Sequence, residues 1–377
     1  MENENIKFEL ESFKWSKTIS LLMKLIFVFV ISSAFLYKRI ILLKMAWVGI
    51  ILNTLVIFLF YLIYKNLSDM KFIILLGKRR KSKNVIVKLP ALNTIKNKRL
   101  IIFSAHYDSV SERYPYKLKR NFYIVITSFF IPYLISTLIL LTWTFLINLS
   151  FLIADDLYLM YIERSIFLSD LLFVFYIILI IILIFNREPS KSFGSIDNAS
   201  GISILIELTK LLNKNPLEKT DILILWFGAE EQGLWGSRQF CAKHFKELNQ
   251  EYDLNSSYAI NIDMVGTYIG LVDRTGILKK NKMNNKIVNI LEATAKNLNI
   301  KLIKYDSTIE PRSDHMSFRS FAKKAKKNLQ VCTFMSNKDM TYIHTSRDTP
   351  NKCSYENLNG CLEICYNAIR GIDSKVE

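Results

Sequence analysis

The chain has 377 residues, a hydrophobic fraction of 51% and a formal net charge of +17. This length predicts one or two domains. The positive charge alone would suit nucleic-acid binding, but the basic residues cluster beside long apolar runs, so we expect membrane flanks and no nucleic-acid partner. The five cysteines are odd in number and lack zinc-finger spacing, which favours a reducing compartment over a disulfide scaffold.

Four long apolar runs predict membrane-spanning helices. Residues 19–37 and 46–64 form one predicted helical hairpin, and residues 122–149 and 165–185 form a second. Each is long enough to cross a hydrocarbon core of about 30 Å. The predicted organisation is a polar N-terminal tail (1–17), a transmembrane hairpin (18–64), a soluble part (65–120), an inserted transmembrane hairpin (121–186) and a second soluble part (187–377).

Short apolar runs without alternation predict strands that are buried on both faces of an α/β sheet. The expected strands are residues 85–89, 100–104, 222–227, 258–262 and 331–334, and the expected helices are residues 202–212, 237–245, 284–298 and 357–370. In open α/β sheets, functional residues gather beyond the carboxyl ends of the strands.

Acidic residues and histidines follow several of these predicted strands. His106 and Asp108 follow one strand, Glu230 and Glu231 follow another, and Asp263 follows a third. Adjacent glutamates repel each other unless a cation holds them, which suggests a metal ligand beside a free base. His-x-Asp suits an imidazole ligand that is oriented by a nearby carboxylate.

Two further candidates complete the set. Asp197 precedes a predicted helix, where it suits either a metal site or an ordinary helix cap, and His344 lies in the segment YIHTSRDTP. Two histidines and three carboxylates suit a pair of Zn²⁺ ions bridged by one carboxylate.

The segments HYD, DNASG, GAEEQGLWGS, NIDMVG, RSDH and HTSRDT occur in this order. Together they resemble the co-catalytic zinc aminopeptidases of metallopeptidase family twenty-eight, over about residues 85–120 and 187–372. The resemblance implies an α/β fold with a mixed sheet flanked by helices on both faces, and two zinc ions per chain. It also implies an exopeptidase that removes N-terminal residues from peptides with a free N-terminus. The apolar runs, which lie outside the resemblance, predict that this enzyme is membrane-bound.

The resemblance also implies a role for each candidate residue. Asp197 matches the carboxylate that bridges both metals; Glu231 and His344 match the other ligands of one zinc, and His106 and Asp263 those of the other. Glu230 matches the general base, and Asp108 matches the partner that orients His106. Asp314 and His315 match no ligand and are interpreted as structural or pocket-forming residues. Ile343 stands where some relatives have an oxyanion-stabilising tyrosine.

Three alternatives stay open beside this interpretation: a glutaminyl-cyclase-like acyltransferase with one zinc, a non-enzymatic receptor-like or scaffolding protein, and a transporter. The sequence leaves the oligomeric state open. Because His106 and Asp197 must meet at one site, the inserted hairpin should cross the lipid bilayer an even number of times. The positive-inside rule then predicts a multi-pass protein of the cell membrane with its catalytic domain in the cytoplasm.

Overall fold

A computed structural model describes residues 6–16, 46–66, 79–93, 98–114, 116–149, 156–184, 191–276, 281–282, 285–308 and 310–374. The chain divides into two compact units. The first combines the N-terminal segment with residues 79–116 and 188–377, and the second combines residues 16–78 and 117–187.

The first unit is built on a nine-stranded mixed sheet with the order β1-β2-β4-β3-β5-β9-β6-β7, and β8 pairs with β6. Its centre is the parallel set β4, β3, β5 and β9, and β2 pairs with β4 in antiparallel register. The strands are β1 (Glu9–Trp15), β2 (Arg80–Leu89), β3 (Arg99–His106), β4 (Thr220–Phe227), β5 (Tyr258–Ile262), β6 (Ile269–Thr275), β7 (Asn281–Lys282), β8 (Leu302–Ser307) and β9 (Gln330–Phe334).

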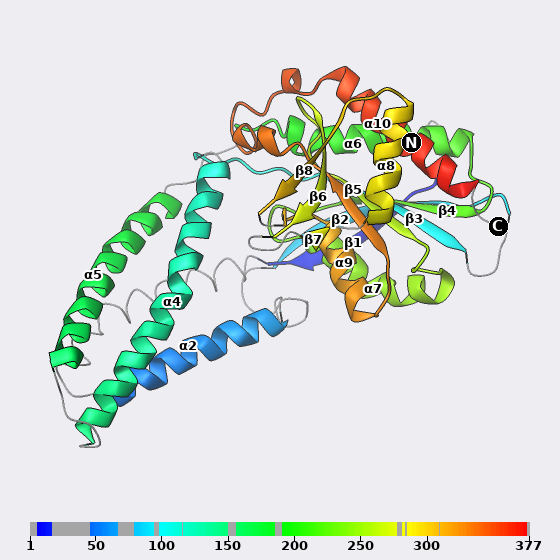
Figure 1. Cartoon of the computed structure of the whole chain (residues 1–377). Coiled ribbons are helices and arrows are strands. Elements are labelled where there is room, and N and C mark those ends of the chain that lie inside the picture. The colour runs from blue at the N-terminus through cyan, green and yellow to red at the C-terminus, as the bar shows by residue number, and fades with distance from the viewer. Residues whose placement is uncertain are drawn as a thin grey trace. The chain divides into compact units, whose positions relative to one another are not determined.

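Helices cover both faces of this sheet (Figure 1). On one face, α6 (Ser200–Lys214), α8 (Asn285–Asn297) and α10 (Tyr355–Asp373) pack against inward side chains such as Phe103. On the other face, α7 (Trp235–Glu251) and α9 (His315–Lys324) pack against residues such as Leu225. Alternate side chains of one strand therefore enter two separate cores, and the predicted α/β fold with its mixed sheet is confirmed.

The predicted polar tail contains an edge strand instead. In β1, Glu11, Phe13 and Trp15 alternate with exposed residues and face inward. Strand β1 pairs with β2 in antiparallel register, and His244 of α7 lies 2.6 Å from the Glu11 carboxylate through its Nε2 atom. The sequence conceals this strand because its apolar and polar residues do not alternate strictly: Glu11 faces inward, whereas Leu10 is exposed.

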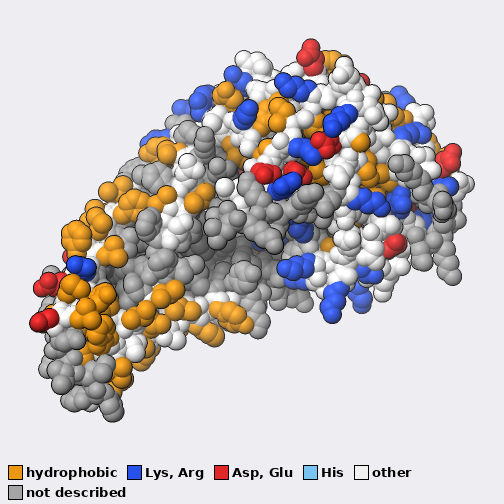
Figure 2. All heavy atoms as spheres, viewed as in Figure 1, with side chains coloured by type: hydrophobic (Ala, Val, Ile, Leu, Met, Phe, Trp, Pro, Cys, Tyr) orange, Lys and Arg blue, Asp and Glu red, His pale blue; other side chains and the backbone are white. Residues whose placement is uncertain are grey.

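The second unit contains the long helices α2 (Ala46–Asn66), α4 (Tyr116–Asn148) and α5 (Asp156–Ile184). They carry many exposed hydrophobic side chains, as Figure 2 shows on one face of the molecule. Yet no helix within the described residues is long and apolar enough to cross a membrane.

The prediction of four spans is therefore not supported, and residues 19–37 lie outside the described part of the chain. The predicted membrane localisation and cytoplasmic orientation relied on those spans and lose that basis, while a lipid bilayer partner stays a prediction.

The core around β3 gives a stability test. Phe103 is fully buried in the central strand, so Phe103→Ala should lower the free energy of unfolding by about 3–5 kcal/mol. Urea denaturation measures this loss, and Leu92→Ala, at a side chain that is 66% exposed, is the control. Equal denaturation midpoints for the two variants would contradict the described packing.

Candidate active site

The site lies at the carboxyl ends of the parallel strands. His106 is the last residue of β3, and Asp263 directly follows β5. After β4 the chain turns sharply, and the backbone carbonyl of Glu230 accepts from the amides of Gly233 and Leu234 at 2.8 and 2.7 Å. Because neighbouring parallel strands end at the same edge of the sheet, residues far apart in sequence meet there.

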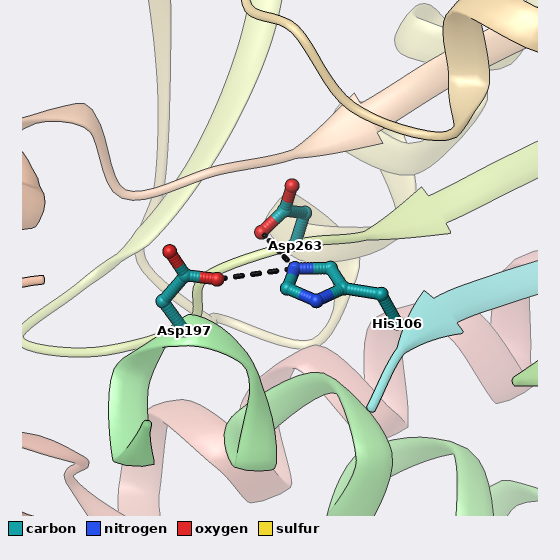
Figure 3. Close-up of side chains that lie close together, drawn as sticks. All are labelled: His106, Asp197 and Asp263. Carbon is teal, nitrogen blue, oxygen red and sulfur yellow. Dashed lines mark ion pairs between the residues drawn. The ribbon is translucent and has the colours of Figure 1, made fainter. Parts of the chain in front are cut away.

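Two groups of side chains share Asp197. In the first group, the Nε2 atom of His106 lies 3.0 Å from Oδ1 of Asp197 and 3.4 Å from Oδ1 of Asp263 (Figure 3). In the second, Nε2 of His344 lies 3.1 Å from Oδ2 of Asp197 and 2.8 Å from Oε1 of Glu231. The structure thus brings together all five residues that the sequence singled out as metal ligands.

Burial concentrates negative charge around the two imidazoles. Burial alone would lower the pKa of His106, but the charges of Asp263 and Glu230 and a hydrogen bond that His106 donates to Asp197 raise that pKa well above its usual value. Burial alone would raise the pKa of Asp197, but hydrogen bonds from His106 and His344 hold it below its usual range. The imidazoles and the carboxylates of the site therefore favour each other's charged forms.

Glu230 and Glu231 differ in their surroundings. Burial, together with the neighbouring charges of Glu231, Asp314 and Asp263, raises the pKa of Glu230 well above its usual value despite the opposing effect of His106. The pKa of Glu231 is also raised, chiefly by burial. The charge of His344, which Glu231 contacts, opposes this rise. Glu230 belongs to neither candidate ligand group, so its carboxyl group is available for proton transfer.

Asp108 supports the site in a way that the sequence does not reveal. Its carboxylate accepts hydrogen bonds from the backbone amides of Glu230 and Glu231 at 2.9 and 3.2 Å. The Nδ1 atom of His106 lies 3.0 Å from the backbone carbonyl oxygen of Asp108, closer than the 3.9 Å to the Asp108 carboxylate. Asp108 therefore orients His106 through its main chain and fixes both glutamates through its side chain.

Strained backbone surrounds the site. Ala229, Met264 and His344 have φ angles of 57°, 74° and 62°, in the left-handed region that non-glycine residues rarely occupy. Each adjoins or is a site residue, and such conformations cost about 1–3 kcal/mol and persist only where surrounding contacts impose them.

Three supporting residues were not singled out from the sequence. Glu112 donates its backbone amide to the carbonyl oxygen of His344 at 2.7 Å and has its Oε2 atom 3.5 Å from the His344 Nδ1 atom. Asp348 accepts from the backbone amide of Ile196 at 2.6 Å. Asn198 binds the carbonyl of Ile262 and the amide of Met264. Asn198 and Asp348 belong to the DNASG and HTSRDT segments, whereas no motif marks Glu112.

The remaining candidates lie beside the cluster. Asp314 is fully buried, neither carboxylate oxygen has a hydrogen-bond partner, and burial raises its pKa to about 7. His315 is also fully buried, and its Nε2 atom lies 3.2 Å from Glu310. Ile343 packs in a small apolar cluster and offers no hydroxyl group.

The residues present fit a metal pair by their chemistry. Nitrogen and oxygen ligands of histidine and carboxylates are those that Zn²⁺ accepts. Within each group, the potential ligand atoms lie within 4.8 Å of one another. Burying several negatively charged carboxylates together costs free energy. A divalent cation would therefore stabilise them.

A mixed sheet whose strand ends gather two histidines and three carboxylates defines a metallohydrolase type of site. Residues 183–369 match the model of peptidase family M28. Over these residues, which are just under half of the chain, the protein is similar to the M28 peptidases, and this similarity agrees with an enzyme of the metallopeptidase type.

One curated relative is "Aminopeptidase YwaD" from Bacillus subtilis (strain 168), which is 40% identical over 75 residues; this segment is 20% of the present chain and 15% of the relative. The matched segment is thus a small part of both proteins.

Among solved structures, the aminopeptidase from Aneurinibacillus sp. strain AM-1 aligns with a TM-score of 0.47 and 21% identity, over 78% of this chain and 48% of the other. BSAP, a zinc aminopeptidase from Bacillus subtilis, aligns with a TM-score of 0.46 and 17% identity, over 80% and 54%. The Porphyromonas gingivalis glutaminyl cyclase aligns with a TM-score of 0.43 and 14% identity, over 80% and 79%.

Zinc affinity should depend on pH. The pKa values of His106 and His344 are raised in the metal-free protein by the surrounding carboxylates, although burial opposes the rise. Protonation of these histidines stabilises the metal-free fold below their unfolded pKa, and that stabilisation is lost as the pH rises through the folded values. A metal must displace these protons, so zinc binding should strengthen as the pH rises and should release protons.

Isothermal titration in buffers of different ionisation enthalpy measures both effects. Zinc affinity that stays constant between acidic and neutral pH, with no proton release, would contradict this assignment.

The bonds from Asp108 give a second test. Asp108→Asn replaces one of the two accepting carboxylate oxygens with an amino group, which cannot accept a hydrogen bond. One of the bonds from the glutamate amides is then lost, so zinc affinity should fall by about tenfold to a hundredfold. Competition with a zinc chelator measures the affinity, and Asp253→Asn in a distant turn is the matched control. Unchanged affinity in Asp108→Asn would show that the glutamates hold their positions without it.

Proposed function

We propose that this protein is a zinc-dependent aminopeptidase that hydrolyses the N-terminal residue of peptides. The observation that carries the proposal is the pair of buried ligand groups sharing Asp197, with Glu230 beside them and outside both groups. The segment identical at 40% to an aminopeptidase supports the same activity.

His106, Asp197 and Asp263 would hold one zinc ion, and Asp197, Glu231 and His344 would hold the other. Two bound Zn²⁺ ions would supply Lewis-acid polarisation of the scissile carbonyl group and acidify the attacking water.

Glu230 supplies the proton transfer. Its carboxylate would take a proton from the attacking water and deliver it to the amine that leaves. Burial and neighbouring carboxylates raise the pKa of Glu230, which lets the side chain hold the proton between these two events. The backbone amide of Glu230 is fixed by Asp108, so the base keeps its position near the reacting groups.

The carboxylates around the site also explain exopeptidase action. The free N-terminus of a peptide carries a positive charge, and the several carboxylates of the site attract this charge. Peptides without a free amine would lack this contact. The proposal therefore names peptides with an unblocked N-terminus as substrates.

A glutaminyl-cyclase-like enzyme with one zinc would require only Asp197, Glu231 and His344. The second group, in which His106 contacts Asp197 and Asp263, favours two metals and hydrolysis. The complete ligand set with its base likewise favours an enzyme over a receptor-like or scaffolding protein.

The two glutamates should have separable roles. Glu230→Gln should keep its zinc and lose turnover by about a hundredfold or more, because the general base is removed. Glu231→Gln should instead lose zinc, because a charged ligand becomes neutral. Peptide hydrolysis and metal content are measured on the same samples, with Glu207→Gln on the exposed face of α6 as the control. Near-normal turnover by Glu230→Gln would reject Glu230 as the base.

A further inference from the structure

An arginine stands at the turn that begins with Glu230. A Cβ atom built on Gly233 would lie 3.3 Å from the Nη2 atom of Arg312 and 3.5 Å from Nε1 of Trp235. Gly233 is hydrogen-bonded to Glu230 through its amide, at 2.8 Å. The Arg312 guanidinium group therefore lies beside the turn that carries Glu230, the proposed general base.

A second arginine lies nearby. Burial and the positive charge of Arg312 lower the pKa of Arg238 to about 10, while Asp314 and Glu230 act in the opposite direction. Two guanidinium groups within electrostatic range of each other repel, and a bound anion removes that cost.

Among the described residues, the two donors beside Gly233 have no acceptor of their own. The indole nitrogen of Trp235 is buried, and no hydrogen-bond partner for it lies in the described part of the chain. Arg312 is exposed, and within the described residues no carboxylate pairs with its side chain, although ion pairs are described for Arg319 and Arg274. An exposed guanidinium without a partner, beside an unsatisfied buried donor, is suited to an incoming acceptor.

We propose that Arg312 is a specificity-determining residue that binds a carboxylate of the substrate. The inference rests on the proposed peptidase function and adds a substrate class. That carboxylate has two possible sources: the side chain of an N-terminal Asp or Glu, or the free C-terminus of a dipeptide.

Matched substrates separate these sources. The peptide amides Glu-Ala-NH₂ and Gln-Ala-NH₂ differ only in the side-chain carboxylate, and Leu-Ala and Leu-Ala-NH₂ differ only in the C-terminal one. For the source that is used, Arg312→Gln should lower kcat/KM for the carboxylate-bearing member by about tenfold to a hundredfold. The neutral member should change little, and zinc content should be unchanged.

Arg274→Gln, which removes an exposed arginine from β6, is the control. In each substrate pair it should leave the ratio of kcat/KM between the charged and the neutral member unchanged. Equal losses for charged and neutral substrates in Arg312→Gln, or no loss for any of them, would overturn the inference.

A binding measurement keeps this inference separate from the proposed activity. Calorimetry on the metal-free protein should show tighter binding of L-glutamate, which carries both kinds of carboxylate, than of the carboxylate-free L-glutaminamide. Arg312→Gln should abolish the difference. If the wild-type protein hydrolyses no peptide but keeps this preference, the proposed function fails and the carboxylate site stands. If the two ligands bind equally, the carboxylate site fails whatever the activity.

Discussion

The site depends on one shared carboxylate. Asp197 places one oxygen 3.0 Å from His106 and the other 3.1 Å from His344. These histidines come from the end of β3 and from the segment after β9, which are far apart in the chain. A single side chain thus joins the two candidate ligand groups, and the remaining contacts serve to hold it and its partners in register.

Local rules of protein structure are broken where the site lies. Carboxylates are buried together, and Ala229, Met264 and His344 adopt left-handed backbone conformations. The central strands on which the site rests follow the rules more closely: in β4, residues 222–227 are all apolar and buried. A rigid, well-packed sheet can tolerate this concentration of strain and charge at its edge.

Much of the arrangement could be predicted from the sequence because strand ends are easily recognised. The apolar runs before His106, Glu230 and Asp263 predict buried parallel strands, and parallel strands bring their carboxyl ends together. The contacts that orient these residues could not be predicted. Glu112 contacts His344 only because the folded chain brings their two loops together. Asp108 acts through both its backbone and its side chain.

Two other features escaped prediction for different reasons. Strand β1 pairs with β2 at the edge of the sheet, and its mixed charge, with Glu11 facing inward, resembles a solvated tail. The apolar runs of the second unit do form the helices α2, α4 and α5, but no helix among the described residues is long and apolar enough to cross a membrane.

Anomalous X-ray scattering at the zinc edge, from crystals grown with zinc, tests the shared role of Asp197 most directly. Our account predicts two zinc peaks about 3.5–4 Å apart, with one Asp197 oxygen directed at each. One peak coordinated only by Asp197, Glu231 and His344, or two peaks that Asp197 does not connect, would contradict it.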